Sequence, residues 1–513
     1  MFLHLPNYYC ALLEVLMKFD YSALRLMSAA YHSISSQPEC YYLISSGFRL
    51  CGWEDYRYGY IDNNGNHFHV NADCFSTLLL CNSWINVLLP AIGHNIRLVL
   101  SNFEALGVIH KCAYGSLGNS EITVTDFSNR DVNNLSWGIT GRCNLKCKHC
   151  FLSAPNAKFG ELPTEECLHM IDDFAACGVT RLSITGGEPL VRSDLFELID
   201  YMREKGITLF GISTNGFLVN KKLLDELDTR ELKPQFSISY DGTNGWHDWL
   251  RGIDGSESRV LDAIQLLSSR GFRTGSAMTV HKKNMNEIVP SIQKLHSVGC
   301  DGFKTNKVLN LGEWISHGSD CALSYQELFE KYLEALEELY CLYPNGMPMR
   351  IVLSRFVRIE KGEVDYKLIP IVTRCTNFDK TRACEATYRK FHISSDGRIQ
   401  PCLALSTIDD QHNTLPYVNQ IGLAASMNHP DFLKLTGASV QTVFDYNPEC
   451  KKCEFASYCL GGCRAIGCAD SPNNYFSKCQ SSCLFFTGHY AEKVTSLLSG
   501  CCAKARCLSP TCS

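Results

Sequence analysis

Short apolar segments alternate with helical segments from Leu135 to about Gly346, and this alternation constrains the fold more than any other feature of the sequence. Amphipathic helical patterns separate the apolar segments, for example at 163–177, 193–205 and 258–270. Six such units predict a parallel sheet with right-handed crossovers, whose functional sites lie at the carboxyl ends of its strands. The expected strands are 135–140, 181–185, 208–213, 235–240, 274–280 and 302–308.

Cysteine is unusually abundant, with 28 residues in a chain of 513. The first residues lack a cationic segment, and Glu14 interrupts the apolar run that follows, so the sequence shows no obvious export signal. In a large chain of this kind clustered cysteines usually bind metal, which predicts a cytoplasmic protein. The net charge of −5 argues against nucleic acid as the main partner.

Three cysteines follow the first expected strand directly: Cys143, Cys147 and Cys150, with the spacing C-x3-C-x2-C. Their position after a strand predicts that they lie at the functional edge of the sheet. A 4Fe–4S cluster usually takes four thiolates, so three local cysteines would leave one iron open for chemistry. The alternative is a structural zinc site whose fourth ligand comes from elsewhere.

This motif at this place resembles the signature of the radical S-adenosylmethionine (SAM) enzymes. The resemblance implies a partial (β/α)6 TIM-like barrel, a 4Fe–4S cluster on the three cysteines, and SAM bound to the fourth iron. One electron from the cluster then splits SAM, and a 5′-deoxyadenosyl radical abstracts a hydrogen atom from the substrate. The segments TGGEP, STNG, SYDG and HDWLRG follow later strands in the order typical of the family.

The same resemblance implies a set of SAM contacts. The residue at position 149 would lie near the adenine, the segment around 186–188 would bind the amino group, and residues 239 and 251 would contact the ribose or the carboxylate. For the arginine at 251, a surface salt bridge is the alternative. The implied contacts are His149, Gly186, Gly187, Glu188, Ser213, Asn215, Ser239 and Arg251.

Seven cysteines between 384 and 479 resemble the SPASM extension of radical SAM enzymes, C-x9–15-G-x4-C, C-x2-C-x5-C-x3-C and a last cysteine. The resemblance implies two auxiliary 4Fe–4S clusters that cross-link a region with little apolar core. A zinc ribbon would explain only the C-x2-C part. The implied ligands are Cys384, Cys402 and Cys463 for auxiliary cluster I, and Cys450, Cys453, Cys459 and Cys479 for auxiliary cluster II.

Several cysteine assignments stay open. The fourth ligand of auxiliary cluster I is either Cys375 or a vacant position open to substrate. Cys483 competes with Cys479 for auxiliary cluster II, and Cys468 has no clear role. The tail cysteines Cys501, Cys502, Cys507 and Cys512 could form a metal site, a redox relay or a substrate-like segment, or be incidental.

Residues 47–115 resemble, in pattern, the winged-helix-like element with which peptide-modifying enzymes bind a leader peptide as an added strand. Strands are expected at 56–61 and 67–70; a structural cap is the alternative. The uncharged run from Cys74 to Gly93 favours two buried short helices over a membrane span. The expected organisation is a helical segment 1–46, this element at 47–115, the barrel at 131–346, the SPASM domain at 375–490 and a tail at 491–513.

Together these features predict a radical SAM enzyme that cross-links a ribosomally made precursor peptide, with an electron donor such as flavodoxin or ferredoxin. A thioether is the favoured bond; a carbon–carbon link or epimerisation stays open. Sulfatase-maturating relatives carry an Asp after the cysteine that corresponds to Cys402, where this chain has Leu403. Modification of a small metabolite or a folded protein, or a non-enzymatic iron–sulfur or zinc scaffold, are the competing interpretations.

Overall fold

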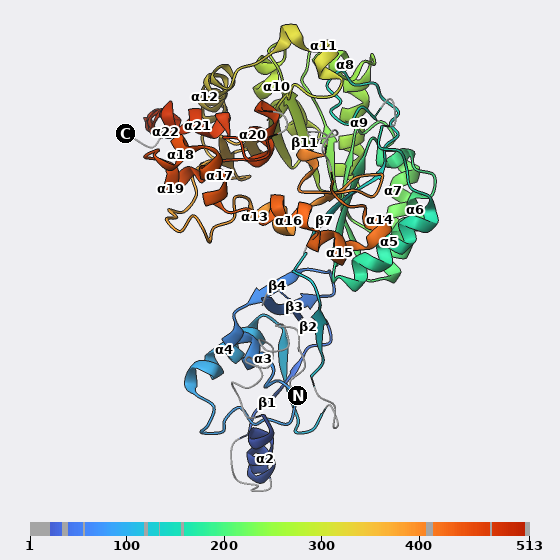
Figure 1. Ribbon diagram of the computed structural model, residues 1–513, viewed down its shortest axis with the longest axis vertical. Helices are drawn as coiled ribbons and strands as arrows, with labels where there is room; N and C mark the ends of the chain where they lie inside the picture. Colours follow the sequence, from blue (N-terminus) through green and yellow to red (C-terminus); the bar gives the residue numbers. More distant parts are fainter. Residues whose placement is uncertain are drawn as a thin grey trace. The chain divides into compact units, whose positions relative to one another are not determined.

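The computed structural model describes residues 21–32, 39–54, 57–116, 122–132, 134–154, 158–406, 414–471 and 474–507 of the chain. It consists of two units (Figure 1). The N-terminal unit comprises the chain up to residue 134 together with 172–181 and 204–208, and the C-terminal unit comprises the rest.

The N-terminal unit contains a four-stranded sheet in the order β4-β3-β2-β6. Strands β2, β3 and β4 form an antiparallel meander, and β6 is parallel to β2. A second, two-stranded sheet pairs β1 with β5. Buried side chains of α3 and α4 pack against the sheet: Phe75 stacks on Tyr58, and Phe103 contacts Tyr60 edge-on. The elements are α2 (Tyr21–His32), β1 (Tyr41–Ile44), β2 (Phe48–Trp53), β3 (Arg57–Asp62), β4 (His67–Val70), α3 (Ala72–Leu78), α4 (His94–Ala105), β5 (Ile109–Cys112) and β6 (Val124–Phe127).

Two sequence predictions are wrong in this unit. Residues 41–44 form a strand, although 1–46 were expected to be helical; residues 1–20 lie outside the described part of the chain. The run from Cys74 to Gly93 contains the end of α3 and then buried irregular chain in place of a second helix. There Asn86 Oδ1 accepts hydrogen bonds from the amides of Cys40 and Leu88, both at 3.0 Å, which fixes turns that a helical pattern does not encode. None of the described helices is long and apolar enough to cross a membrane.

The C-terminal unit is built on an eleven-stranded sheet in the order β15-β14-β13-β12-β11-β10-β9-β8-β7-β16-β17 (Figure 1). All six expected strands are present, which confirms the α/β barrel architecture. The barrel continues beyond the expected boundary at 346, because β13 adds a further parallel strand to β12. The strands are β7 (Leu135–Thr140), β8 (Arg181–Gly186), β9 (Thr208–Thr214), β10 (Gln235–Ser239), β11 (Thr274–Val280), β12 (Gly302–Lys307), β13 (Arg350–Leu353), β14 (Val357–Ile359), β15 (Tyr366–Leu368), β16 (His392–Ile393) and β17 (Ile399–Gln400).

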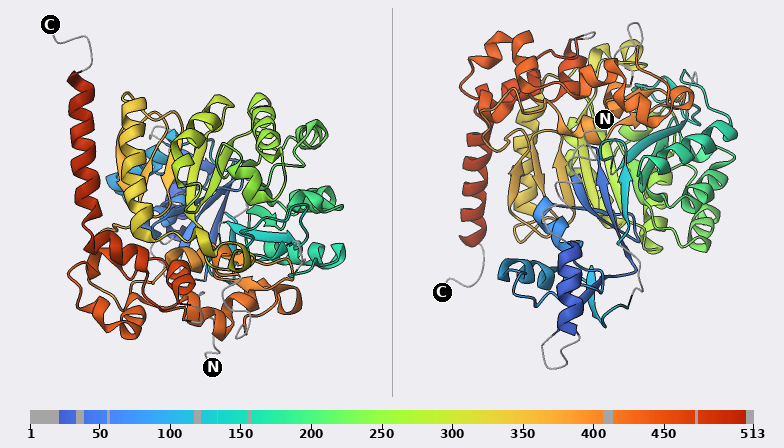
Figure 2. Two further views of the ribbon diagram at one scale, coloured as in Figure 1. Left: turned by 90° about the horizontal axis from the view of Figure 1, so that it is seen from above. Right: turned by 60° about the horizontal axis from the view of Figure 1, so that its bottom comes forward.

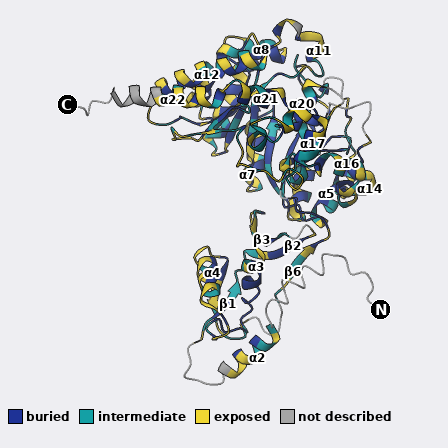
Figure 3. Ribbon diagram, turned by 60° about the vertical axis from the view of Figure 1, so that its left-hand side comes forward, coloured by how far each residue is buried: buried dark blue, intermediate teal, exposed yellow. Residues whose placement is uncertain are grey.

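The strands of this sheet have one fully buried face and one half-buried face. In β11, Ser276, Met278 and Val280 are buried, whereas the residues between them are only half-buried. Helices surround the sheet on its outer side, and buried residues concentrate in the strands (Figures 2 and 3). The half-buried face, which carries small and polar residues, therefore lines the inside of an open barrel. The helices are α5 (Thr164–Ala176), α6 (Leu195–Glu204), α7 (Lys221–Thr229), α8 (Trp246–Arg251), α9 (Ser256–Ser269), α10 (Ile288–Ser297), α11 (Trp314–His317) and α12 (Tyr325–Leu342).

The cysteine-rich region after residue 375 consists of short helices. Its hairpin β16–β17 extends the barrel sheet, since β16 lies parallel to β7 with His392 opposite Ser136. The last helix runs beside α12, where the Tyr490 hydroxyl donates to Glu330 at 2.8 Å (Figure 2). The helices are α13 (Glu385–Arg389), α14 (Val418–Ile421), α15 (Leu423–Asn428), α16 (Pro430–Thr436), α17 (Val440–Tyr446), α18 (Pro448–Lys451), α19 (Ala456–Cys459), α20 (Arg464–Asp470), α21 (Gln480–Thr487) and α22 (Tyr490–Cys507).

Candidate functional site

The segment Gly141–Cys150, here called the cysteine loop, begins where β7 ends. Burial, together with the nearby Cys147 and Cys150, raises the pKa of Cys143 to about 11. The three thiols therefore lie close enough to influence one another. Backbone amides point at two of the sulfurs: Leu145 N–H donates to Cys143 Sγ at 3.5 Å, and Ala154 N–H to Cys150 Sγ at 3.4 Å. Half-buried thiols with raised pKa values become thiolates readily only when a cation binds them.

The glycines of the TGGEP segment bring the end of β8 against the cysteine loop. A Cβ atom at Gly186 would lie 2.2 Å from the carbonyl oxygen of Thr140, and one at Gly187 would lie 2.2 Å from that of Arg142. The amide of Gly187 donates to Thr140 at 2.8 Å. Only glycine allows these backbones to approach so closely. The two glycines therefore bring the end of β8 close to the loop that carries the cysteines.

Glu188 connects two strand ends. Its carboxylate is buried and accepts hydrogen bonds from the Thr214 hydroxyl at 2.8 Å, the Asn215 amide at 2.7 Å and the Leu190 amide at 3.1 Å. Burial raises the pKa of Glu188 to about 7. The carboxylate is thus engaged by donors of the protein itself. It positions Asn215, whose side chain reaches back to the cysteine loop.

Asn215 lies directly beside the first cysteine. Its Nδ2 donates to Asn144 Oδ1 at 2.8 Å and lies 3.9 Å from Cys143 Sγ. Of the other expected SAM contacts, Ser213 and Ser239 stand at the ends of β9 and β10, half-buried and on the face opposite Ile212 and Ile238. The structure therefore places these residues at the same end of the barrel as the cysteine loop.

Arg251 is buried, so the alternative of a surface salt bridge is wrong. Its Nε donates to Asp241 Oδ2 at 2.7 Å, and its Nη1 lies 3.6 Å from Cys147 Sγ. Asp241 also accepts the amide of Thr279 at 2.8 Å, which fixes the carboxylate between β10 and β11. Asp241 belongs to the SYDG segment, and the sequence predicted no role for it. Its signal is the acidic residue at a strand end, ten residues before the arginine.

His149 provides the clearest indication of a ligand. Its Nδ1 atom is buried and has no hydrogen-bond partner among the described residues. Burial and the nearby Arg251 charge lower the pKa of His149 to about 3, so the ring is neutral and can form a hydrogen bond with a neutral partner. Three converging thiols, amides directed at sulfur and an orphaned imidazole nitrogen fit an iron–sulfur cluster with a nucleotide beside it.

A first group of cysteines in the C-terminal region, group I, consists of Cys384, Cys402 and Cys463. Burial, together with the nearby Cys463 and Cys384, raises the pKa of Cys402 to about 12, which indicates that the three thiols lie near one another. Cys468 is buried in the apolar cluster that also contains Cys402 and Cys463. This gives Cys468 a packing role that the sequence left open.

Cys375 has other neighbours. Its Sγ lies 2.9 Å from the Thr381 hydroxyl, and its amide donates to the carbonyl of Ser457 at 3.0 Å. These contacts do not identify it as the fourth member of group I, so that assignment stays a hypothesis.

A second group, group II, lines one pocket between α17, α19 and α21. Burial, together with the nearby Cys479, Cys450 and Cys483, raises the pKa of Cys459 to about 12. Phe444, Phe455 and Phe486 also line this pocket and exclude water from it. Five thiols thus compete for the four positions of one cluster. The cysteines lining the pocket are Cys450, Cys453, Cys459, Cys479 and Cys483.

A buried arginine lies next to group I in the chain. Arg464 follows Cys463 directly, is 1% exposed, and donates to the carbonyls of Ser477 and Gly461. Among the described residues no carboxylate forms an ion pair with it, and its Nε has no hydrogen-bond partner. A buried, unpaired charge is strongly unfavourable. Thiolate-ligated clusters in groups I and II would supply the missing negative charge, so the surroundings of Arg464 fit such clusters.

The open barrel and the cysteine loop after its first strand agree with a family comparison, in which residues 137–295 match the model of the radical SAM superfamily. The chain contains a radical SAM domain, which implies one iron–sulfur cluster and SAM. Curated relatives include the AdoMet-dependent heme synthase of Methanosarcina barkeri, 26% identical over 64% of this chain and 90% of that protein. The antilisterial bacteriocin subtilosin biosynthesis protein AlbA of Bacillus subtilis is 28% identical over 77% of this chain and 82% of that protein.

Among solved structures, Streptococcus suis SuiB bound to its precursor peptide SuiA is similar with a TM-score of 0.59. The similarity covers 86% of this chain and 99% of SuiB at 16% sequence identity. At this identity the comparison concerns the fold. It confirms the fold class expected from the sequence.

Proposed function

We propose that this chain is a cytoplasmic radical SAM maturase that forms an intrapeptide cross-link, with a thioether favoured, in a ribosomally made precursor peptide. The observation that carries the proposal is the gathering of the C-terminal cysteines into two separate groups in the unit that also holds the cysteine loop. Similarity to a bacteriocin biosynthesis protein over 77% of the chain supports a peptide substrate.

Cys143, Cys147 and Cys150 would hold the SAM cluster. When bound, the cluster and SAM supply an electron and a 5′-deoxyadenosyl radical that abstracts hydrogen. The protein's own residues orient this chemistry: Glu188 and Asn215 fix the loop from one side, while the expected SAM contacts share its end of the barrel. An electron donor such as flavodoxin or ferredoxin would deliver the reducing equivalent.

Groups I and II would hold two auxiliary 4Fe–4S clusters. Cys384, Cys402 and Cys463 would ligate auxiliary cluster I, whose fourth position would be either occupied by Cys375 or open to substrate. Cys450, Cys453, Cys459 and Cys479 would ligate auxiliary cluster II. The preference for a thioether comes from group I, since a cluster with three protein ligands has one iron that could bind a substrate thiolate.

The N-terminal unit would bind the leader of the peptide. In the described sheet β4 is an edge strand that pairs only with β3. Unpaired backbone groups on an edge strand accept an added strand, and its side chains determine which peptide fits. Phe68 of β4 is 41% exposed and stacked on Tyr60, so it offers an apolar contact to such a strand.

A second candidate is a radical SAM enzyme that acts on a small molecule. Similarity to a heme synthase over 90% of that protein's length favours a tetrapyrrole in this case. A formylglycine-forming reaction is disfavoured, because Cys402 is followed by Leu403 where such enzymes carry an Asp.

The test is anaerobic co-expression with a short Cys-containing peptide encoded beside the gene, followed by mass spectrometry. We expect about twelve irons per chain, release of 5′-deoxyadenosine, and a peptide that has lost two hydrogens. Phe68→Asp should weaken peptide binding, whereas Leu98→Asp, at another exposed apolar residue of the same unit, should not. An unmodified peptide together with turnover of a porphyrin would favour the second candidate.

A further inference from the structure

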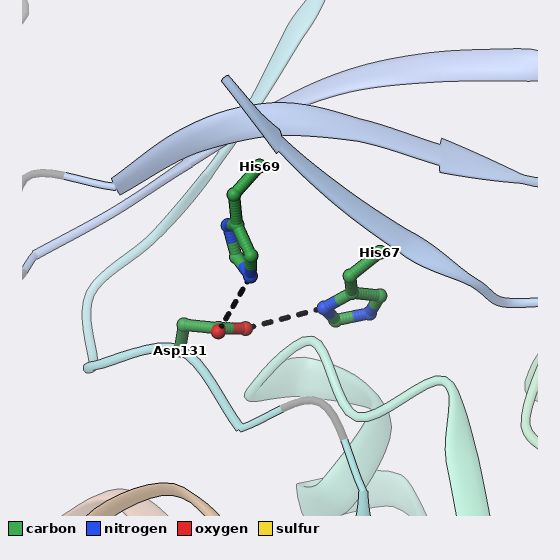
Figure 4. Close-up of side chains that lie close together, drawn as sticks. All are labelled: His67, His69 and Asp131. Atoms are coloured by element: carbon green, nitrogen blue, oxygen red, sulfur yellow. Dashed lines mark hydrogen bonds and ion pairs between the residues drawn. The ribbon is translucent and has the colours of Figure 1, made fainter. Parts of the chain in front are cut away.

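A compact group of two histidines and one aspartate lies in the N-terminal unit, separate from every cysteine group. His67 and His69 are two residues apart on β4, and Asp131 lies on the segment that follows β6 (Figure 4). His67 Nδ1 is 3.2 Å from Asp131 Oδ1, and His69 Nε2 is 3.0 Å from Asp131 Oδ2. One ligand atom from each residue lies within 4.8 Å of the other two.

The hydrogen bonds around His67 determine which of its nitrogens carries a proton. The Thr180 hydroxyl donates its only proton to the carbonyl of Gly65 at 2.7 Å. His67 Nε2, which is also 2.7 Å from that hydroxyl oxygen, must therefore be the donor in their contact. In a neutral imidazole, Nδ1 then presents a lone pair to a carboxylate oxygen. Two lone pairs at 3.2 Å require a cation between them, either a second proton or a metal ion.

The distances suit a metal ion. Bonds of about 2.0–2.1 Å around a tetrahedral centre put neighbouring ligand atoms roughly 3.3 Å apart. The observed separations, 3.2 Å from His67 to Oδ1 and 3.0 Å from His69 to Oδ2 of Asp131, are close to this value, and one ligand atom from each residue lies within 4.8 Å of the other two. The bond from His67 Nε2 to Thr180 is the outer contact that typically orients a metal-binding histidine.

The surroundings leave one side of the group open. The side chains of His67 and Asp131 are 1% and 0% exposed, whereas that of His69 is 26% exposed. The ring of buried Trp53 lies against both imidazoles, with centroids 5.3 and 5.5 Å away. An ion could enter beside His69 and keep a water molecule as its fourth ligand, while Trp53 excludes water from the inner side.

We propose that His67, His69 and Asp131 form a zinc site that ties the edge strand β4 to the segment after β6. Two imidazoles and one carboxylate favour a borderline ion such as Zn²⁺ over Mg²⁺ or Ca²⁺, which prefer oxygen ligands. The site does not depend on the reaction proposed above. It would restrain the strand whose outer edge is exposed for pairing.

The test measures zinc in the full chain with its clusters reconstituted, after incubation with ZnCl₂ and exhaustive dialysis. The wild-type protein should retain one more zinc per chain than His69→Ala, and His94→Ala, at an exposed histidine of the same unit, should match the wild type. Thr180→Val should lower zinc affinity about 10- to 100-fold. Comparison between variants cancels any zinc that the cysteine groups retain.

A second measurement covers the case in which a variant folds poorly. Hydrogen exchange of the β4 amides in the wild-type chain should slow when zinc is added. Equal zinc content in wild type and His69→Ala, or β4 exchange that does not respond to zinc, would overturn the proposal. The group would then be a buried ion pair between protonated His67 and Asp131.

Discussion

The cysteine loop and the C-terminal cysteine groups differ in how much of their shape the surrounding protein provides. The loop lies at the end of a barrel whose first six strands are five to seven residues long. Gly186 and Gly187 let the end of β8 approach it closely, and Arg251 lies beside Cys147. The hydrogen bond from the Asn215 amide to Glu188 fixes the neighbouring strand end. Groups I and II lie among helices of four to eight residues and two two-residue strands. Helices shorter than about 12 residues are marginal on their own.

This difference in structural support indicates where a bound cluster would matter for folding. The barrel can present its three thiols in advance, because the geometry of the loop comes from strand ends and buried polar bonds. In the described part of the C-terminal region, Arg464 instead has no carboxylate partner, and five thiols line one pocket. Binding energy that arises only in the folded state is folding energy. We therefore expect clusters to stabilise groups I and II far more than the barrel.

The largest effect is expected from Cys147→Ala, which removes a ligand from the loop. SAM cleavage should fall to background, because the cluster would lose one of its three protein ligands and the contact with Arg251. Hydrogen exchange of the barrel strands should stay within a few-fold of the wild type. Cys167→Ala, at a buried cysteine of α5, is the matched control and should keep activity. Unfolding of the barrel in Cys147→Ala would contradict a loop formed in advance.

Removal of all clusters by anaerobic chelation comes next. Amides between residues 384 and 479 should exchange about 100-fold faster, which corresponds to a loss of about 2.7 kcal/mol of local stability. Amides of β7 to β12 should change by less than tenfold. Mass spectrometry of peptic fragments measures both regions in one experiment, and equal acceleration of both would remove the distinction between them.

Glu188→Gln tests the connection between β8, β9 and the loop. Glutamine offers one acceptor where Glu188 receives three hydrogen bonds, so at least one buried donor loses its partner, at a cost of about 1–3 kcal/mol. SAM cleavage should fall about tenfold to hundredfold as Asn215 shifts. Glu161→Gln removes a partly exposed carboxylate that pairs with exposed Arg142 of the same loop at 2.7 Å, and it should have little effect. Similar losses in both variants would mean that loop charge, not the buried connection, matters.

The sequence predicted the barrel well, because its apolar strand segments alternate regularly with amphipathic helical segments. All six predicted strands begin at the residue where the structure begins them, and the first of them locates the cysteine loop. It missed the five strands from β13 to β17, which are two to four residues long and carry little periodic signal. It missed the strand at 41–44 because pairing with β5 is a long-range interaction.

The candidate site divides in the same way. Spacing identified the three loop cysteines, but the role of Asp241 depends on Arg251 across a helix and on the amide of Thr279. The group of His67, His69 and Asp131 spans 64 residues of sequence, and only the fold brings it together. Local patterns therefore predicted ligands, and the contacts that position them required the structure.

The smallest expected effect distinguishes Cys479 from Cys483. Both cysteines line the group II pocket, but Cys479 is only 2% exposed. Burial, and then the charge of Cys463, raise the pKa of Cys479, which indicates that Cys479 also lies near group I. Cys479→Ala should therefore lose about four irons per chain. Cys483→Ala should keep iron content and turnover within about twofold, because Cys483 is only partly buried and a cysteine that binds no metal behaves as a small apolar residue. Iron analysis and electron paramagnetic resonance of the reduced clusters measure this directly. Loss of iron only in Cys483→Ala would reverse the assignment. The ligand of auxiliary cluster II would then be Cys483, and the cysteine near Cys463 of group I would bind no cluster.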